Sequence, residues 1–303
     1  MDTVSVKPSP AETLTDVMAR FTAYIGKRLP NDVSDKLAQL RAKETKALAK
    51  TVYDSMAENQ DAAKRLNRPS CQDTGIIQYF IKAGAKFPLL GELEDILRDA
   101  TLAATKAGPL RHNAVETFDE KNTGTNTGRS IPWLDWEIVP DDDGATIDVY
   151  MAGGGCTLPG AAKVLMPGEG YEGVTKFVFD VITSTGVNAC PPLLVGVGVS
   201  SSAEMAARLS KKAILREVGS HNANANAAKM ETLLEDGLNE IGIGPQGLSG
   251  NSSVMGVNIE NSARHPSTIG VAVSTGCWAH RRGRIRINAD LSYDILSHKD
   301  AVL

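Results

Sequence analysis

Three of the four cysteines of this 303-residue chain stand in loop-like settings and could carry chemistry. Cys71 lies in PSCQDTG, Cys190 in NACPPLL and Cys277 in STGCWAHRRG, each beside proline or glycine at a predicted strand end. The intervals between them are far longer than the roughly two to four residues between paired zinc-finger cysteines. A shared site would therefore have to be assembled by the fold. Three such thiols suit a soft metal or an iron–sulfur cluster, and the alternative for each is a small buried hydrophobe.

The number of ligands decides what such a cluster could do. A cluster held by three thiolates leaves one iron without a protein ligand. That iron can act as a Lewis acid on a substrate hydroxyl or carboxylate, as the open position of a catalytic zinc does.

Other polar residues could serve a small anionic substrate. Arg111, in LRHN, can form a forked pair with a carboxylate, or it is an ordinary surface arginine. The segment MAGGGCT from Met151 offers backbone N–H groups that can approach an anion closely, or it is simply a tight turn. His265 precedes a proline that restrains the backbone, so its imidazole could act as acid, base or hydrogen-bond donor; a structural or exposed histidine is the alternative. The basic run from His280 to Arg284 is expected to be a solvated or interface turn.

The elements that must position these residues follow from local patterns. Ser9-Pro-Ala-Glu12 predicts a capping box with proline at the first helical position. A long second helix is expected over residues 32–59, and Pro69 ends this helical zone. Further helices are expected over residues 89–107, 171–184, 203–212 and 224–240, and strands over residues 75–82, near Ile138, and over 145–151, 193–199, 269–274 and 284–288.

The alternation of helices and strands predicts an α/β or α+β fold with a mixed sheet flanked by helices. A helical N-terminal region of about residues 1–66 precedes it. With no repeat and no clear linker, we expect a single domain over residues 1–303.

Composition narrows the class of protein. The formal net charge is -4 and the pI is near 5.8, which does not favour a nucleic-acid or membrane surface. No apolar run is long enough to span a bilayer, and Met1–Pro10 lacks the apolar core of a secretory signal. We therefore expect a cytoplasmic protein.

Several motifs together carry a family resemblance. They are CQDTG, LRHNAVETFDEKNTGTNTG, YMAGGGCTLPG, VNACPPLLVGVG, LSKKAILR, GIGPQGLSGNSSVMGV and HPSTIGVAVSTGCWAHRRG. Across nearly the whole chain they resemble the alpha subunit of class I fumarase-type hydro-lyases. Within that family, GGGCTLPG is similar to the branch that dehydrates L(+)-tartrate, whereas the fumarases usually carry a GSEN-like sequence there.

The resemblance implies a 4Fe–4S cluster on Cys71, Cys190 and Cys277, with Cys156 near the site but not a ligand. It implies that Gln72, Asp73, Arg111, the backbone of Gly154, and His265 bind a hydroxy-dicarboxylate substrate. It also implies a separate beta subunit, in a heterotetramer of two alpha and two beta subunits. That subunit would supply further arginines, a lysine and a threonine as catalytic base.

The reaction implied is the dehydration of tartrate to oxaloacetate, with Asp73 as the first candidate for the acid that protonates the departing hydroxide. His265 contacts the substrate. Two alternatives remain at this point. One is a fumarate hydratase alpha subunit on the same scaffold. The other is an iron–sulfur interaction or sensor subunit without chemistry of its own.

Overall fold

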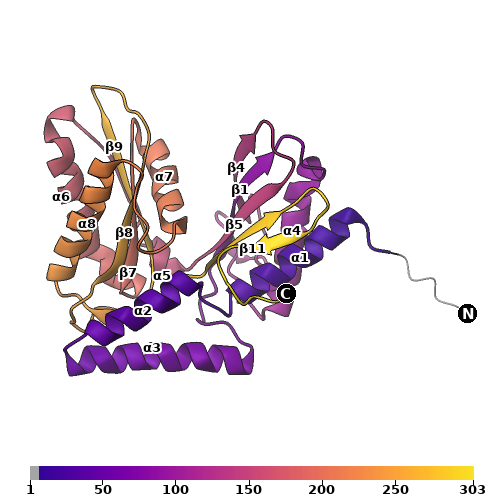
Figure 1. The fold of residues 1–303 in the computed structure, drawn as a ribbon, viewed down its shortest axis with the longest axis horizontal. Coiled ribbons are helices and arrows are strands. Elements are labelled where there is room, and N and C mark those ends of the chain that lie inside the picture. The colour runs from indigo at the N-terminus through magenta and orange to yellow at the C-terminus, as the bar shows by residue number, and fades with distance from the viewer. Residues whose placement is uncertain (1–6) are drawn as a thin grey trace, which may run out of the picture. The chain divides into compact units, whose positions relative to one another are not determined.

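The computed structural model describes residues 7–303, and their contacts divide them into two compact units. Unit 1 comprises the residues up to Pro30, Ala62–Ala152 and Arg281–Leu303, and unit 2 comprises Asn31–Asp61 and Gly153–His280. Each unit has a sheet with helices packed on it (Figure 1), which confirms the α/β class. The expected helical N-terminal region is present over the described residues from Pro10 to Leu66, but its middle part belongs to unit 2.

Unit 1 is built on a five-stranded mixed sheet in the order β11-β10-β5-β1-β4. The strand β1 (Ile76–Gly84) pairs in parallel with β4 (Trp133–Val139) and antiparallel with β5 (Ala145–Ala152). The strand β10 (Arg282–Ile287) pairs antiparallel with both β5 and β11 (Tyr293–Ile295). The last segment of the chain therefore completes a sheet that begins at residue 76.

Two helices, α1 (Pro10–Ile25) and α4 (Leu93–Ala107), pack against each other and supply much of the core of unit 1. The predicted capping box at the start of α1 is confirmed: the Ser9 N–H donates to Glu12 at 2.7 Å, and the Glu12 N–H donates to the Ser9 hydroxyl at 3.2 Å. Gly283 explains how α1 approaches β10, because a Cβ there would lie 2.6 Å from the side chains of Phe21 and Ile25.

The single helix expected over residues 32–59 is wrong. The structure has two helices, α2 (Asn31–Lys43) and α3 (Ala47–Leu66), separated at Glu44. The buried Glu44 carboxylate accepts hydrogen bonds from the N–H groups of Thr45 and Lys46. It thereby fixes the short turn between the two helices, just before α3 begins at Ala47. The helical zone ends before Pro69, as predicted.

Unit 2 is built on a four-stranded mixed sheet in the order β6-β9-β7-β8. The strand β7 (Leu193–Ser200) lies parallel to β8 (Val254–Asn261) and antiparallel to β9 (Ile269–Gly276). The strand β6 (Ala161–Leu165) pairs antiparallel with β9 at one edge. Nearly every residue of β7, β8 and β9 is buried, as expected of strands covered on both faces.

Helices cover both faces of this sheet. The helices α6 (Gly170–Thr185) and α8 (Ala225–Glu240) lie on one face, and α7 (Ala203–Leu215) lies on the other (Figure 1). Two glycines of β7 allow α7 to approach closely. A Cβ at Gly198 would lie 1.9 Å from the carbonyl oxygen of Ala206, and one at Gly196 would lie 2.3 Å from that of Ser210. The glycines of VGVGV therefore serve helix–sheet packing.

The remaining elements are short and lie between the larger ones. They are the strands β2 (Val115–Glu116) and β3 (Lys121–Asn122), the helix α5 (Gly154–Thr157), and the 3-10 helices η1 (Leu90–Glu92), η2 (Pro167–Glu169), η3 (Gly186–Ala189) and η4 (Pro245–Gly247).

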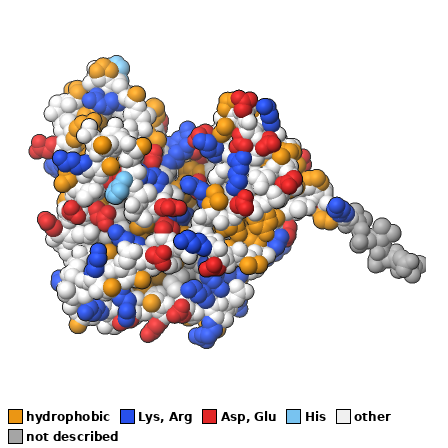
Figure 2. All heavy atoms as spheres, in the orientation of Figure 1, with side chains coloured by type: hydrophobic (Ala, Val, Ile, Leu, Met, Phe, Trp, Pro, Cys, Tyr) orange, Lys and Arg blue, Asp and Glu red, His pale blue; other side chains and the backbone are white. Residues whose placement is uncertain are grey.

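Among residues 7–303, no helix combines the length and apolarity needed to cross a membrane. Figure 2 shows Lys and Arg side chains interspersed with Asp and Glu on the visible face, in keeping with the small net charge.

Candidate active site

The CQD loop, residues 67–75 of unit 1, carries the first cysteine. It begins where α3 ends, at Asn67 with a left-handed φ of 52°, and it leads into β1. Cys71 and Asp73 are partly exposed and Gln72 is exposed. The Gly75 N–H donates to Asp73 Oδ1 at 3.0 Å, and Gly75 has a φ of 78°, which favours glycine. The loop therefore presents Cys71, Gln72 and Asp73 together at the start of a core strand.

Arg111 is tied to this loop through its backbone. Its N–H donates to the Thr74 hydroxyl at 3.0 Å, and the same hydroxyl donates to the Arg111 carbonyl at 3.4 Å. The Asn113 side-chain amide donates to the Gly75 carbonyl at 3.1 Å. Unit 1 thus brings Arg111 beside the residues that follow Cys71, as the site hypothesis requires.

The basic run from His280 is not the solvated turn expected from the sequence. His280 and Arg281 are each 1% exposed and Arg282 is 4% exposed. Arg281 donates to the carbonyl oxygen of Asp73 at 2.7 Å, so its buried guanidinium braces the CQD loop. Arg282 begins β10, a strand in the interior of the unit 1 sheet. The sequence pattern failed here because buried arginines are rare and are held by acceptors far away in sequence.

Unit 2 brings the second and third cysteines side by side. Cys190 follows η3 and precedes β7, and Cys277 follows β9, whose last residue pairs with Leu194. The N–H of Trp278 donates to the Cys190 carbonyl at 3.1 Å. Cys190 is exposed and has a left-handed φ of 54°, whereas Cys277 is buried. A non-glycine residue in that conformation is uncommon and is enriched at functional sites.

The glycine segment before Cys156 approaches the same region of unit 2. A Cβ at Gly155 would lie 2.8 Å from the carbonyl oxygen of Asn188, two residues before Cys190. Only glycine fits such an approach, and it leaves the neighbouring Gly154 exposed at the start of α5. The Thr275 hydroxyl donates to the Cys156 carbonyl at 2.6 Å. Gly154, Cys156, Cys190 and Cys277 therefore lie around one end of the unit 2 sheet.

Lys211, on α7, was missed in the sequence. Its pKa is lowered because burial penalises the ammonium, while the Cys156 thiol acts in the opposite direction. This places the amine of a half-buried lysine near Cys156 at the same end of unit 2. LSKKAILR resembles the family, but helical periodicity gives no sign of which of its two lysines points inward.

His265 lies at the other end of the same sheet. Its N–H donates to the hydroxyl of Ser201, which directly follows β7, whereas Cys190 precedes β7. The first and last of the eight residues of β7 are separated by seven rises of about 3.3 Å, which is roughly 23 Å. Unit 2 therefore does not bring His265 to the Cys190 and Cys277 of its own chain.

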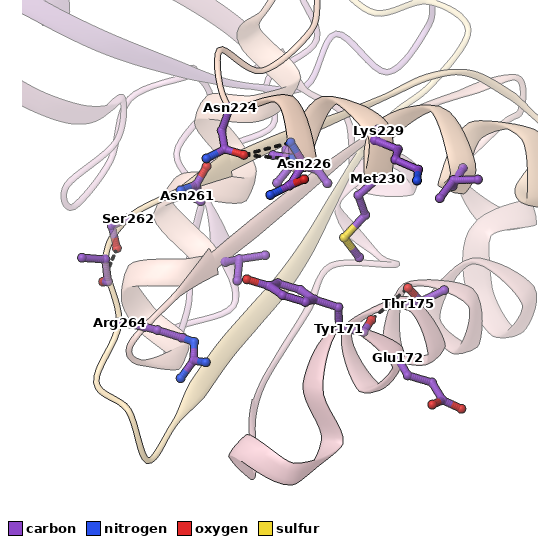
Figure 3. A pocket seen from close by; sticks show the side chains of 15 residues that line it. Tyr171, Glu172, Thr175, Asn224, Asn226, Lys229, Met230, Asn261, Ser262 and Arg264 are labelled. Atoms are coloured by element: carbon purple, nitrogen blue, oxygen red, sulfur yellow. Dashed lines mark hydrogen bonds between the residues drawn. The ribbon is translucent and has the colours of Figure 1, made fainter.

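The cavity of about 540 Å³ in unit 2 lies at this His265 end (Figure 3). Tyr171 of α6, Met230 of α8, and Arg264, the residue before His265, line it. Among the described residues, its lining includes none of the expected cluster or substrate residues. The cavity is thus separate from the cysteine end of unit 2.

The donor chemistry fits an iron–sulfur cluster. All four cysteines are present as thiols, with no disulfide, and thiolates are the usual ligands of such clusters. Within residues 7–303, no three His, Cys, Asp or Glu side chains are grouped so that they could hold a metal ion. Cys71, however, belongs to unit 1, and Cys190 and Cys277 to unit 2.

Comparison with known proteins decides the family. The profile of the family described as Fumarate hydratase (Fumerase) matches residues 15–286. The chain belongs to the fumarate hydratase family. It is therefore a hydro-lyase chain, as expected from the resemblance.

Close relatives cover the whole length of this fumarate hydratase family member. The L(+)-tartrate dehydratase subunit alpha of Escherichia coli strain UTI89 is 62% identical over 99% of both chains, and that of strain K12 is 61% identical over the same share. A chain of Methanocaldococcus jannaschii is 32% identical over 91% of this chain and 98% of its own length.

Proposed function

We propose that this chain is the alpha subunit of a hydro-lyase that dehydrates L(+)-tartrate to oxaloacetate and water. The observation that carries the substrate is the 61–62% identity, over 99% of both chains, to proteins named as L(+)-tartrate dehydratase subunit alpha. The GGGCTLPG segment around Cys156 supports the same branch of the family.

Cys71, Cys190 and Cys277 are the proposed ligands of a 4Fe–4S cluster. The hydrogen bond between Trp278 and the Cys190 carbonyl supports a shared role for two of them, because it holds their loops together. When bound through three thiolates, the cluster supplies an iron that acts as a Lewis acid on the substrate. Cys156 is not a ligand in this proposal.

The substrate's carboxylates are held by Gln72, Arg111 and the Gly154 N–H. Asp73 is the proposed acid. Its carboxyl group would carry the proton that is transferred. Asp73 gives this proton to the departing hydroxide, which leaves as water, while a base supplied by the partner takes the proton from the adjacent carbon. The resulting enol tautomerises to oxaloacetate: its hydroxyl releases one proton and the neighbouring carbon takes one up.

His265 enters this proposal from a second copy of the chain. The roughly 23 Å between its end of the unit 2 sheet and the cysteine end is far beyond contact distance. His265 can therefore touch a substrate held near Cys190 and Cys277 only if those cysteines belong to another copy. This agrees with an assembly that contains two alpha subunits.

The partner is a beta subunit, in a heterotetramer of two alpha and two beta subunits located in the cytoplasm. Support comes from the designation "subunit alpha" of the relatives. The test is to co-express this chain with the beta subunit from the same source, reconstitute the complex without oxygen, and measure iron, sulfide and tartrate dehydration. A cluster-loaded complex that does not dehydrate L-tartrate would overturn the substrate assignment.

Fumarate hydratase is the second candidate, because the matching family is described by that activity. The same preparation should be given L-malate and L-tartrate in competition. We expect the higher kcat/KM with L-tartrate, and a clear preference for L-malate would favour the second candidate.

A further inference from the structure

The spacing between Asp73 and Arg111 depends on one buried hydroxyl. Both residues are proposed to face the same substrate, yet they lie on separate segments of unit 1. Thr74 follows Asp73 directly, and its side chain is 2% exposed. Its Oγ1 accepts from the Arg111 N–H at 3.0 Å and donates to the Arg111 carbonyl at 3.4 Å. A single side chain thus contacts both backbone polar groups of Arg111.

Two further contacts hold the CQD loop in place on either side of this hydroxyl. Asn113 donates to the Gly75 carbonyl at 3.1 Å, on the strand side. Arg281 donates to the Asp73 carbonyl at 2.7 Å, on the loop side. The loop backbone is therefore held in place on both sides of Thr74. The Thr74 hydroxyl in turn fixes the position of the Arg111 backbone.

We propose that Thr74 is a positioning residue that sets where the Arg111 guanidinium stands relative to Cys71, Gln72 and Asp73. This rests on the proposed function for the identity of the substrate. The physical basis is that a buried hydroxyl bonded to an N–H and a carbonyl leaves two backbone groups unpaired when it is removed. The Arg111 backbone would then shift to find other partners, and its side chain would move with it.

The test is Thr74→Val, which keeps the shape of the side chain and removes both hydrogen bonds to Arg111, together with the one that Thr74 Oγ1 accepts from Asn113 Nδ2 at 3.5 Å. In the reconstituted complex we expect the KM for L-tartrate to rise by about tenfold, the effect of about 1.4 kcal/mol, with a smaller change in kcat. Iron and sulfide content should stay at the wild-type value. Thr74→Ser keeps the hydroxyl and should restore the KM.

Thr101→Val is the matched control. Thr101 is also a fully buried threonine of unit 1, but its hydroxyl bonds to Tyr79 and to the Leu97 carbonyl. It should lower thermal stability without changing the KM. Asn113→Ala is the second variant if Thr74→Val does not fold. It removes the side-chain bonds to the Gly75 carbonyl, to Thr74 Oγ1 and to Asp73 Oδ1, and it should also raise the KM.

Amide hydrogen exchange separates this inference from the proposed function. The peptide containing Arg111 should exchange faster in Thr74→Val than in wild type or Thr101→Val, whatever substrate the enzyme uses. Unchanged exchange at Arg111, an unchanged KM, or an equal KM increase in Thr101→Val would each overturn the positioning role. Faster exchange in an enzyme that ignores tartrate would overturn the substrate and leave the positioning role standing.

Discussion

The position of His265 allows a decisive test of how the active site is assembled. His265→Ala removes the imidazole, and Asp73→Asn removes the proposed acid. If His265 serves a second copy, each variant alone lacks a working site, because every site contains the altered residue. We expect Asp73→Asn to lower kcat by about 10²-fold or more, the usual contribution of an acid or base.

A mixed complex behaves differently. When one alpha subunit carries Asp73→Asn and the other carries His265→Ala, one site receives both lesions and the other receives neither. With two sites in a two-fold assembly, about half of the wild-type activity should return. The roughly 23 Å between the Ser201 end and the Cys190 end of the β7 strand is the structural basis of this expectation.

The assay uses two affinity tags, one on each variant, and purifies complexes that carry both. Tartrate dehydration is measured together with iron content, so that a loss of cluster is not mistaken for a loss of His265. Recovery to about half supports the reasoning. Activity no higher than that of the parents would refute it, since His265 would then act within its own chain. Full activity of His265→Ala alone would remove this residue from the site.

Three further predictions concern stability. Gly198→Ala places a Cβ 1.9 Å from the Ala206 carbonyl oxygen and should lower the free energy of unfolding by about 1–3 kcal/mol in denaturant titrations. In the control variant Gly168→Ala the new Cβ meets no atom within 4 Å, so the free energy of unfolding should hardly change. Equal effects of the two variants would contradict the packing argument. Glu231 is 1% exposed and accepts from Arg216 at 2.9 Å and from the Ile259 N–H at 2.7 Å, so Glu231→Ala should cost about 3–5 kcal/mol. Glu235→Ala, which removes a more exposed ion pair with Lys36, should cost about 1 kcal/mol or less by the same titration. Hydrogen bonds from Arg286 hold the pKa of Asp142 well below the ordinary 3.8. This carboxylate therefore stabilises the fold at neutral pH, and its stabilising effect is lost as the pH falls below 3.8. The difference in Tm between wild type and Asp142→Asn should shrink over that range, and a constant difference would contradict the prediction.

Local signals predicted much of the fold. The capping box at Ser9 begins α1 where expected, and the runs of apolar residues in β7 and β9 are strands within a residue or two of the predicted bounds. These predictions depend on residues a few positions apart, which is the range over which helix capping and strand alternation act.

Features that depend on distant partners could not be predicted. The break between α2 and α3 is held by the Glu44 carboxylate, which accepts from the N–H groups of Thr45 and Lys46 just before α3 and from the distant Asn251 N–H at 2.8 Å. The burial of Arg281 requires the Asp73 carbonyl, far away in sequence. In both cases a charged side chain looked solvated because its acceptor or donor was not local.

In the candidate site, too, the sequence motifs identified residues, whereas contacts between distant segments could not be predicted. The family motifs indicated Cys71, Cys190 and Cys277, and the structure adds that the last two are neighbours through Trp278. The positioning contacts of Thr74 and Asn113 were missed, since a threonine and an asparagine in polar loops carry no distinguishing pattern. The separation of His265 from the cysteines was also missed. His265 and Cys277 lie at opposite ends of β9, and the antiparallel pairing of β7 with β9 places Cys190 at the Cys277 end.

The discontinuous make-up of unit 1 has a consequence for biosynthesis. The strand β10 and the Arg281 brace both lie in Arg281–Leu303, which is synthesised after all four cysteines. In a nascent chain the loop around Cys71 therefore exists before the Arg281 guanidinium that braces it. A product that stops before Arg281 would therefore keep every thiol and still lack the brace that holds the first one in place.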